Sequence, residues 1–146
     1  FLAQNIKAKP GMITDKSGKT LGTHKGLFLY TIGQRKGLHV CGKKPYYVLD
    51  KDLKRNNLVV TEKEKDLLKK ELIVKDASWV SGKLSTFSNV NVRIRYRSKP
   101  ALARLAKISG KRYKVIFNKP QRAITPGQSA VFYKGDRLLG GGIIKK

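Results

Sequence analysis

Acidic residues are scarce in this chain, and one long stretch has none. The 146 residues include 9 aspartates and glutamates against 33 lysines and arginines, a formal net charge of +24. Between Asp76 and Asp136 there is no carboxylate, although that stretch carries thirteen basic side chains. A surface without counter-charges attracts polyanions from a distance, so a nucleic acid is the expected partner. The alternative is a generally cationic surface without a specific ligand.

Cysteines, long apolar runs and paired carboxylates are also lacking. Cys41 is the only cysteine, which excludes an internal disulfide and a cysteine-rich zinc site, and we interpret it as structural or incidental. No apolar run approaches the ~20 residues that cross a bilayer. Without a Ser/His/Asp set, the sequence predicts no catalytic, cofactor-binding or metal-binding residues in this chain. The lack of a signal sequence predicts a cytoplasmic protein.

Two glycine-containing motifs resemble nucleotide-binding loops but have the wrong context. The segment DKSGKT ends like a phosphate-binding loop, yet Ile13 stands where that loop needs a glycine. A hairpin turn between strands at 12–14 and 20–21 is the better interpretation. The three glycines at 140–142 are followed by no helix pattern, so we expect them to bend a strand or to let two backbones approach closely.

The hydrophobic pattern predicts a mainly β protein with two domains. We place the boundary between residues 67 and 68, which gives a partial, β-rich central domain at 1–67 and a small closed β-barrel at 68–146. The first domain is expected to contain short strands and one helical turn. Besides the hairpin, strands are predicted at 26–30, 46–49 and 58–60, and the helical turn at 32–36.

In the second domain, period-two alternation suggests which side chains face outward. Val90, Val92, Ile94 and Tyr96 alternate with Asn91, Arg93, Arg95 and Arg97, which predicts three arginines on one strand face, about 6.6 Å apart, and Tyr96 facing inward.

The rest of that domain is predicted to contain further strands and one long connection. Tyr113 and Tyr133 are expected in the core, although an exposed ring could stack on an unpaired base. Residues 118–128 are predicted to form a turn-rich connection, with Pro126 and Gly127 at the corner of a type II turn. Two more strands, at 129–133 and 137–144, would form a hairpin around the segment KGD.

Two long strings resemble a known family. GTHKGLFLYTIGQRKGL covers residues 22–38 and PQRAITPGQSAVFYKGDRLLGGGII covers residues 120–144, with ASWVSG and VRIRYR between them in the expected order. Together they are similar to the central and C-terminal parts of bacterial tRNA-specific 2-thiouridylases. Since the chain begins at Phe1 and not at methionine, we interpret it as part of a longer protein.

The resemblance implies an activity whose chemistry lies outside this chain. The family replaces an oxygen of the wobble uridine of certain tRNAs with sulfur. It uses ATP, with magnesium, to adenylate the base, and takes sulfur from a persulfide relay through a sulfur-carrier protein. The N-terminal catalytic domain, with its pyrophosphate loop and two cysteines, does not match any part of this sequence. Cys41 does not match a family cysteine and does not inherit its role.

The resemblance also implies a fold and a set of tRNA contacts. The family's C-terminal domain is a β-barrel of the translation-factor type that holds the tRNA. The family contacts map onto Arg95, Tyr96 and Gln128, and Arg93 and Arg97 are expected to touch the phosphate backbone beside them. A contact at Tyr96 conflicts with the inward position that strand alternation predicts, unless the strand ends or bulges there. The segment YTIGQRKGL would pack against the absent catalytic domain, and its Arg35 and Lys36 could also touch RNA.

Our hypothesis is therefore a tRNA-binding C-terminal part of a tRNA 2-thiouridylase, inactive by itself. Its partners would be tRNA, the catalytic domain and a sulfur carrier, with no membrane. The first alternative is a stand-alone RNA-binding or ribosome-associated barrel without catalytic activity. The second is a cationic module that binds a membrane surface.

Overall fold

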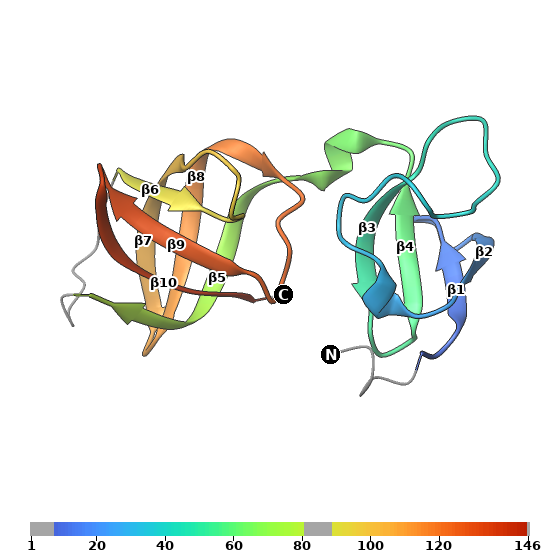
Figure 1. Cartoon of the computed structure of the whole chain (residues 1–146), viewed down its shortest axis with the longest axis horizontal. Coiled ribbons are helices and arrows are strands. Elements are labelled where there is room, and N and C mark those ends of the chain that lie inside the picture. The colour runs from blue at the N-terminus through green and yellow to red at the C-terminus, as the bar shows by residue number, and fades with distance from the viewer. Residues whose placement is uncertain (1–7, 81–88, 146) are drawn as a thin grey trace. The chain divides into compact units, whose positions relative to one another are not determined.

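The computed structural model describes residues 8–80 and 89–145, and its regular structure is almost entirely β-strand, as the sequence predicted. The chain divides into two units, Phe1–Leu67 and Leu68–Lys146, and each has a sheet and a core of its own (Figure 1). Residues 1–7 of the expected central domain, and 81–82 of the ASWVSG motif, lie outside the described residues. In the described part of the chain, no helix is long and apolar enough to span a bilayer.

The first unit is a four-stranded sheet with the strand order β2-β1-β4-β3 (Figure 1). The strands are β1 (Gly11–Thr14), β2 (Thr20–His24), β3 (Tyr47–Asp52) and β4 (Asn57–Thr61). β1 pairs antiparallel with β2 and parallel with β4, while β3 and β4 form an antiparallel pair. The core is mainly aliphatic: Ile13, Val48, Leu58 and Val60 of the strands are fully buried, and the segments between the strands add Leu27, Tyr30 and Leu38.

The DKSGKT segment is a hairpin turn between β1 and β2, as predicted, and not a phosphate loop. Asp15 Oδ1 accepts hydrogen bonds from the Ser17 N–H (2.9 Å), the Ser17 hydroxyl (2.6 Å) and the Lys19 N–H (3.0 Å). The Ser17 hydroxyl, more than any other group, lowers the pKa of Asp15 below its ordinary value. The carboxylate therefore occupies the turn that an anion would need in a phosphate-binding loop.

The strand predicted at 26–30 is wrong, because this segment forms the 3-10 helix η1 (Leu27–Leu29). The Leu29 N–H donates to the Gly26 carbonyl and the Tyr30 N–H to the Leu27 carbonyl, each at 3.2 Å. Leu27 and Tyr30, three residues apart, are buried, whereas Phe28 and Leu29 are exposed. An apolar run of this length does not by itself distinguish a strand from a helical turn.

The helical turn predicted at 32–36 is also wrong, although the contact that suggested it exists. Gln34 Oε1 accepts from the Thr31 N–H at 3.0 Å, as in a capping box. No helix follows, because Gly33 has a φ of 88° and its N–H donates to the Val48 carbonyl at 2.8 Å. The Val48 N–H returns a bond to the Gln34 carbonyl at 2.9 Å, so the turn is bound to β3.

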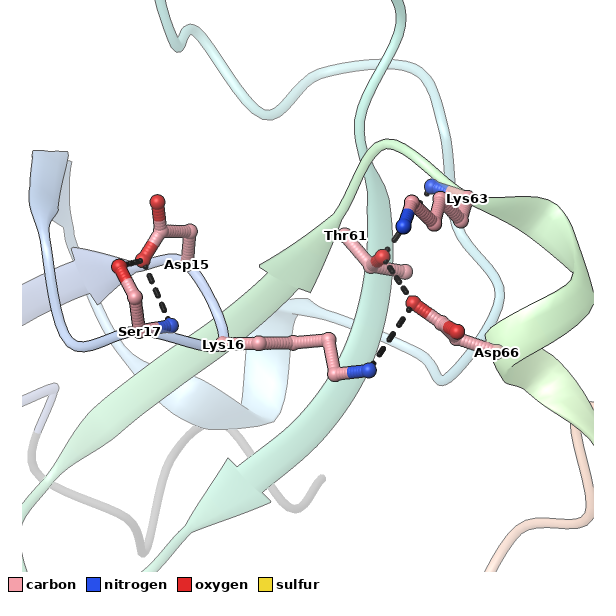
Figure 2. Close-up of polar contacts among 6 residues, drawn as sticks. All are labelled: Asp15, Lys16, Ser17, Thr61, Lys63 and Asp66. Carbon is pink, nitrogen blue, oxygen red and sulfur yellow. Dashed lines mark hydrogen bonds and ion pairs between the residues drawn. The ribbon is translucent and has the colours of Figure 1, made fainter.

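The first unit ends in the 3-10 helix η2 (Glu64–Leu67), which is tied back to the β1–β2 hairpin through Asp66. The Thr61 hydroxyl donates to Asp66 Oδ2 at 2.6 Å, and the Lys16 ammonium lies 3.4 Å from the same oxygen. Both contacts are drawn in Figure 2. The Lys63 N–H in turn donates to the Thr61 hydroxyl at 3.1 Å. These groups, the Thr61 hydroxyl first and the Lys16 charge after it, hold the pKa of Asp66 below its ordinary value of 3.8.

Acid should therefore weaken the first unit through Asp66. Because its folded-state pKa is lowered, the carboxylate stabilises the fold at pH values above about 4 and loses that contribution as the pH falls through the lowered value. Asp66→Asn should reduce the stability of β1 and β4 at neutral pH, and this difference from wild type should shrink as the pH falls below the ordinary aspartate value of 3.8. Hydrogen exchange of the backbone amides in β1 and β4, compared between Asp66→Asn and wild type across this pH range, measures the difference in stability. A deficit of the same size at every pH would contradict the electrostatic origin, and Asp136→Asn in the other unit is the control.

The second unit is a closed antiparallel barrel with the strand order β10-β5-β8-β7-β6-β9, as Figure 1 shows. A small closed barrel was predicted here, and the hairpin around KGD is confirmed as β9 and β10. Its strands are β5 (Leu68–Trp79), β6 (Val90–Arg93), β7 (Ala101–Ser109), β8 (Arg112–Arg122), β9 (Ser129–Lys134) and β10 (Arg137–Lys145). The connection predicted at 118–128 is shorter than expected, because β8 continues through Arg122.

Three aromatic rings form a cluster within the largely aliphatic core of the barrel. Trp79 stacks on Phe132, with ring centroids 5.3 Å apart, and meets the edge of Tyr113 at 5.1 Å. Tyr113 is buried, which confirms its predicted place in the core. Such aromatic pairs add to the free energy of burial, so this cluster fixes the packing of β5, β8 and β9.

The glycines at 140–142 let β10 lie close to its neighbours, as expected. A Cβ at Gly140 would lie 2.2 Å from the Ser78 carbonyl oxygen, and one at Gly141 would lie 2.7 Å from that of Ala130. The pairing of β10 shifts register on both sides of this stretch. Glycine is therefore required where β10 passes between β5 and β9.

Candidate functional site at one rim of the barrel

Two connections lie at the same end of the barrel, since neighbouring strands alternate in direction. We call residues 94–100, between β6 and β7, and residues 123–128, between β8 and β9, the rim loops. Neither loop contains a carboxylate, and Arg95, Arg97 and Lys99 lie in the first. The acidic residues Asp76 and Asp136 belong to the opposite end, at the end of β5 and in the β9–β10 hairpin. The rim loops therefore carry positive charge with no carboxylate of their own.

Arg95 ties the two rim loops together. Its guanidinium donates to the Arg122 carbonyl at 3.1 Å and to the Ala123 carbonyl at 2.7 Å. The Thr125 hydroxyl donates to the same Ala123 oxygen at 3.0 Å. Ala123 has a φ of 54°, a left-handed conformation that is unfavourable for alanine, and these bonds hold it there. Arg95 is thus part of the framework of the rim and does not stand free on a strand face.

Tyr96 lies at the tip of a tight turn that Arg95 and Ser98 close. The Ser98 N–H donates to the Arg95 carbonyl at 3.1 Å, and its hydroxyl donates to the same oxygen at 2.9 Å. Tyr96 is 89% exposed, and Arg97 beside it is exposed as well. The inward position predicted for Tyr96 is wrong, because β6 ends at Arg93 and the alternation does not continue.

The same early end of β6 overturns the predicted row of three arginines on one strand face. Arg93 is the last residue of the strand, while Arg95 and Arg97 belong to the turn that follows. Ile94 is still buried, so the segment leaves the barrel wall directly after it. The basic side chains of this segment are therefore shared between the outer wall and the rim.

Gln128 closes the second rim loop. The type II turn predicted at Pro126 and Gly127 is confirmed: Gly127 has a φ of 89°, and the Gln128 N–H donates to the Thr125 carbonyl at 3.3 Å. The Gly127 N–H donates to the Ile144 carbonyl, and the Ile144 N–H to the Gln128 carbonyl, both at 2.8 Å. The exposed Gln128 side chain therefore stands on a turn that is fixed to the end of β10.

Comparison with known proteins identifies the family. Residues 69–144 match the family described as the aminomethyltransferase beta-barrel domain, and residues 1–62 match the tRNA methyl transferase PRC-barrel domain. The tRNA-specific 2-thiouridylase MnmA of Vibrio vulnificus is 43% identical to this chain over 100% of its length. The chain belongs to the tRNA-specific 2-thiouridylase family. The resemblance seen in the sequence strings is thereby confirmed.

The chain covers only part of these thiouridylases. It corresponds to 42% of the Vibrio vulnificus protein, and to 42% of a Clostridium botulinum MnmA that is also 43% identical over the whole chain. A Trichlorobacter lovleyi MnmA is 45% identical over 97% of the chain, which corresponds to 40% of that protein. This thiouridylase-family chain therefore spans about two fifths of the length of the curated relatives that it matches.

Arg93 lies on the outer wall of the barrel and not on the rim. Its guanidinium carbon is 5.7 Å from the centre of the Tyr133 ring, and its Nε is buried without a hydrogen-bond partner. The core position predicted for Tyr133 is wrong, because its neighbour Phe132 takes the inward place. The alternation of Ala130 and Phe132 was the signal that could have placed Tyr133 outside.

The side chains of the rim are groups that can bind a ligand. Among the described residues, no group of three histidine, cysteine, aspartate or glutamate side chains is placed to hold a metal ion. Cys41 is exposed, with a free thiol. Glu71 forms an ion pair with Lys114 at 3.0 Å on the barrel wall, away from the rim loops. What the rim offers is an aromatic ring, cationic side chains and an amide on two braced loops.

Proposed function

We propose that this chain holds the tRNA substrate of a tRNA 2-thiouridylase, with the rim loops of the barrel as a principal contact. Tyr96 would stack on a base or sugar, Arg97 would pair with phosphate, and Gln128 would donate or accept a hydrogen bond. Arg95 would act mainly by holding both loops in place. Arg93 would contribute from the barrel wall. The family relatives, whose names specify tRNA, support this choice of nucleic acid.

The observation that carries the proposal is the exposure of Tyr96. A large ring that is 89% exposed gains little from burial, yet its turn is braced by Ser98 and by the Arg95 bonds to the second rim loop. A rigid turn that presents a ring to solvent avoids an entropic cost when a ligand covers that ring. The carboxylate-free rim selects a polyanion as that ligand.

The reaction itself would take place in the part of the protein that this chain does not span. We propose that ATP, with magnesium, adenylates the wobble uridine there, and that a sulfur-carrier protein supplies a persulfide sulfur. A base that leaves its stack must be held in register with the catalytic site, and binding the rest of the tRNA achieves this. By itself, this chain would bind tRNA and catalyse nothing.

The test is a tRNA-binding titration with a Tyr96→Ala variant. Loss of one stacked base should weaken binding by about 5- to 50-fold, while stability should change by less than about 0.5 kcal/mol because the ring is exposed. Tyr96→Phe keeps the ring and should bind within about twofold of wild type. Unchanged affinity in Tyr96→Ala would remove the rim from the proposed interface.

A salt series separates backbone contacts from stacking. If four to six phosphates are contacted, the logarithm of the binding constant should fall with the logarithm of salt at a slope of about −3 to −5. Tyr96→Ala should leave this slope unchanged, since tyrosine releases no counterion. An affinity independent of salt would refute the phosphate contacts. Equal affinity for tRNA and for an unrelated structured RNA would favour a general RNA-binding barrel instead.

A further inference from the structure

A hollow on the outer wall of the barrel is not accounted for by the rim. Its volume is about 220 Å³, below the roughly 300–1,000 Å³ of pockets that enclose a drug-sized ligand. It is lined by Asn91, Arg93, Pro100, Tyr133, Gly135 and Asp136. These residues come from β6, β9, the β9–β10 hairpin and the residue before β7.

Strand register explains why these side chains meet. Asn91 pairs with Tyr133, and Arg93 pairs with Val131, across the β6–β9 ladder. Because Val92 and Phe132 point into the core, their neighbours in both strands point outward on the same face. The hollow is thus built on paired strands, which position side chains more accurately than free loops do.

The chemistry of the hollow combines a flat platform with polar edges. The Arg93 guanidinium carbon lies over the Tyr133 ring, 5.7 Å from its centre, so the two groups form a cation–π contact. Arg93 Nε is buried without a hydrogen-bond partner, so the side chain keeps a donor that no protein group satisfies. The Asn91 amide offers a donor and an acceptor, and the Asp136 carboxylate offers acceptors only.

We propose that this hollow binds one unpaired nucleoside of an RNA strand, at a site distinct from the rim. The base would stack on the guanidinium plane of Arg93 or on the Tyr133 ring, and Asn91 would hydrogen-bond to its edge. Asp136 would repel a phosphate but accept a hydrogen bond from a ribose hydroxyl or an exocyclic amine, so the uncharged part of the nucleotide fits better than its phosphate. The volume suits a single nucleoside.

The hollow and the rim are close enough in the chain to serve one ligand. Arg93 is two residues before Arg95, and Pro100 is two residues after Ser98, so the first rim loop begins and ends beside the hollow. An RNA strand that contacts Tyr96 can therefore continue along the outer wall of the barrel to the hollow. That the ligand is RNA rests on the proposed function, whereas the choice of an unpaired nucleoside rests on the hollow itself.

The experiment compares a fluorescein-labelled single-stranded RNA of 12 nucleotides with a duplex of the same length, by fluorescence anisotropy on the whole chain. Tyr133→Leu should weaken single-strand binding by about 5- to 50-fold and duplex binding by less than about twofold, because paired bases are not free to stack. Tyr133→Phe keeps the ring and should stay within about twofold of wild type. Equal losses for single strand and duplex, or no loss, would overturn the proposal.

Arg93 provides a second, independent test. Arg93→Lys keeps the charge but loses the planar guanidinium, so the proposal expects single-strand affinity to fall about fivefold or more with an unchanged salt slope. Wild-type affinity in Arg93→Lys would show that only the charge matters and would overturn the stacking role. Near-ultraviolet circular dichroism of Trp79, inside the barrel, reports whether each variant is folded. If the Tyr133 variant fails to fold, Asn91→Ala replaces it, with an expected single-strand loss of about threefold; no loss would overturn the proposal.

The two proposals can fail separately. If Tyr96→Ala has no effect while Tyr133→Leu weakens single-strand binding, the proposed tRNA contact at the rim loops is wrong and the nucleoside site in the hollow is supported. If Tyr96→Ala weakens tRNA binding while Tyr133→Leu does not change binding of any RNA, the nucleoside site in the hollow is wrong and the tRNA contact at the rim loops is supported.

Discussion

Arg95→Ala should lower the tRNA affinity of this chain by about tenfold or more, and it should also lower stability by about 1 kcal/mol. The guanidinium donates to the carbonyl of Arg122 at the end of β8, at 3.1 Å, and to that of Ala123 in the second rim loop, at 2.7 Å, and alanine would leave both carbonyls without this donor. Hydrogen bonds from a charged group contribute about 1.5–3 kcal/mol each when buried, and less here because Arg95 is exposed. The binding loss follows because Tyr96 and the second rim loop would no longer be held in one arrangement.

Arg97→Ala is the matched control, since it removes an arginine two residues away on the same turn. Arg97 is exposed, so its loss should change stability by less than about 0.5 kcal/mol and should reduce the salt slope by about 1. Urea unfolding and tRNA titration of both variants separate the two roles. If Arg95→Ala and Arg97→Ala gave the same stability and the same slope, Arg95 would be an ordinary surface charge and the bracing role would be wrong.

Gly140→Ala should be the most destabilising single methyl addition in the barrel, with an expected loss of about 3 kcal/mol. The new Cβ would lie 2.2 Å from the Ser78 carbonyl oxygen and 3.0 Å from the Trp79 Cα. Both are backbone atoms, so β5 and β10 would have to separate and the pairing of Gly140 with Trp79 would be lost. Guanidinium unfolding monitored by Trp79 fluorescence measures the change.

Gly135→Ala is the control for this substitution. Any residue other than glycine would be strained at position 135, where φ is 60°, but a Cβ there would meet no atom within 4 Å. Its expected cost is therefore about 1 kcal/mol, from the left-handed backbone alone. A Gly140→Ala variant no less stable than Gly135→Ala would show that β10 does not approach β5 as closely as described.

The parts of the fold that were predictable are those set by local chemistry. The Asp15 hairpin and the Pro126–Gly127 turn follow from side chains that satisfy or permit a specific backbone conformation. The barrel strands follow from alternation between turns, as at Tyr113, Val115 and Phe117, which are all buried. In these cases the residues that determine the structure are neighbours in the sequence.

Two of the errors, the continued strand after Arg93 and the helical turn at 32–36, have a common physical origin in contacts between distant segments. The alternation of RIRYR continues past Arg93, but the Arg95 guanidinium bonds to carbonyls 27 and 28 residues away, and the strand ends before it. Likewise, Gly33 and Gln34 bond to Val48 on β3 instead of starting a helix. The candidate site depends on the exposure of Tyr96. Only the family resemblance could predict this exposure, because strand alternation predicts that Tyr96 faces the core.

Barrel closure makes assembly of this unit depend on its last strand. β10 is the partner of both β5 and β9, so neither has its full set of ladder bonds until residues 137–145 are in place. During synthesis, β10 is the last of the six strands to leave the ribosome, so β5 and β9 each keep an unsatisfied edge until it emerges. We therefore expect a nascent chain that stays open, and that needs protection from pairing with other chains, until translation has passed β10.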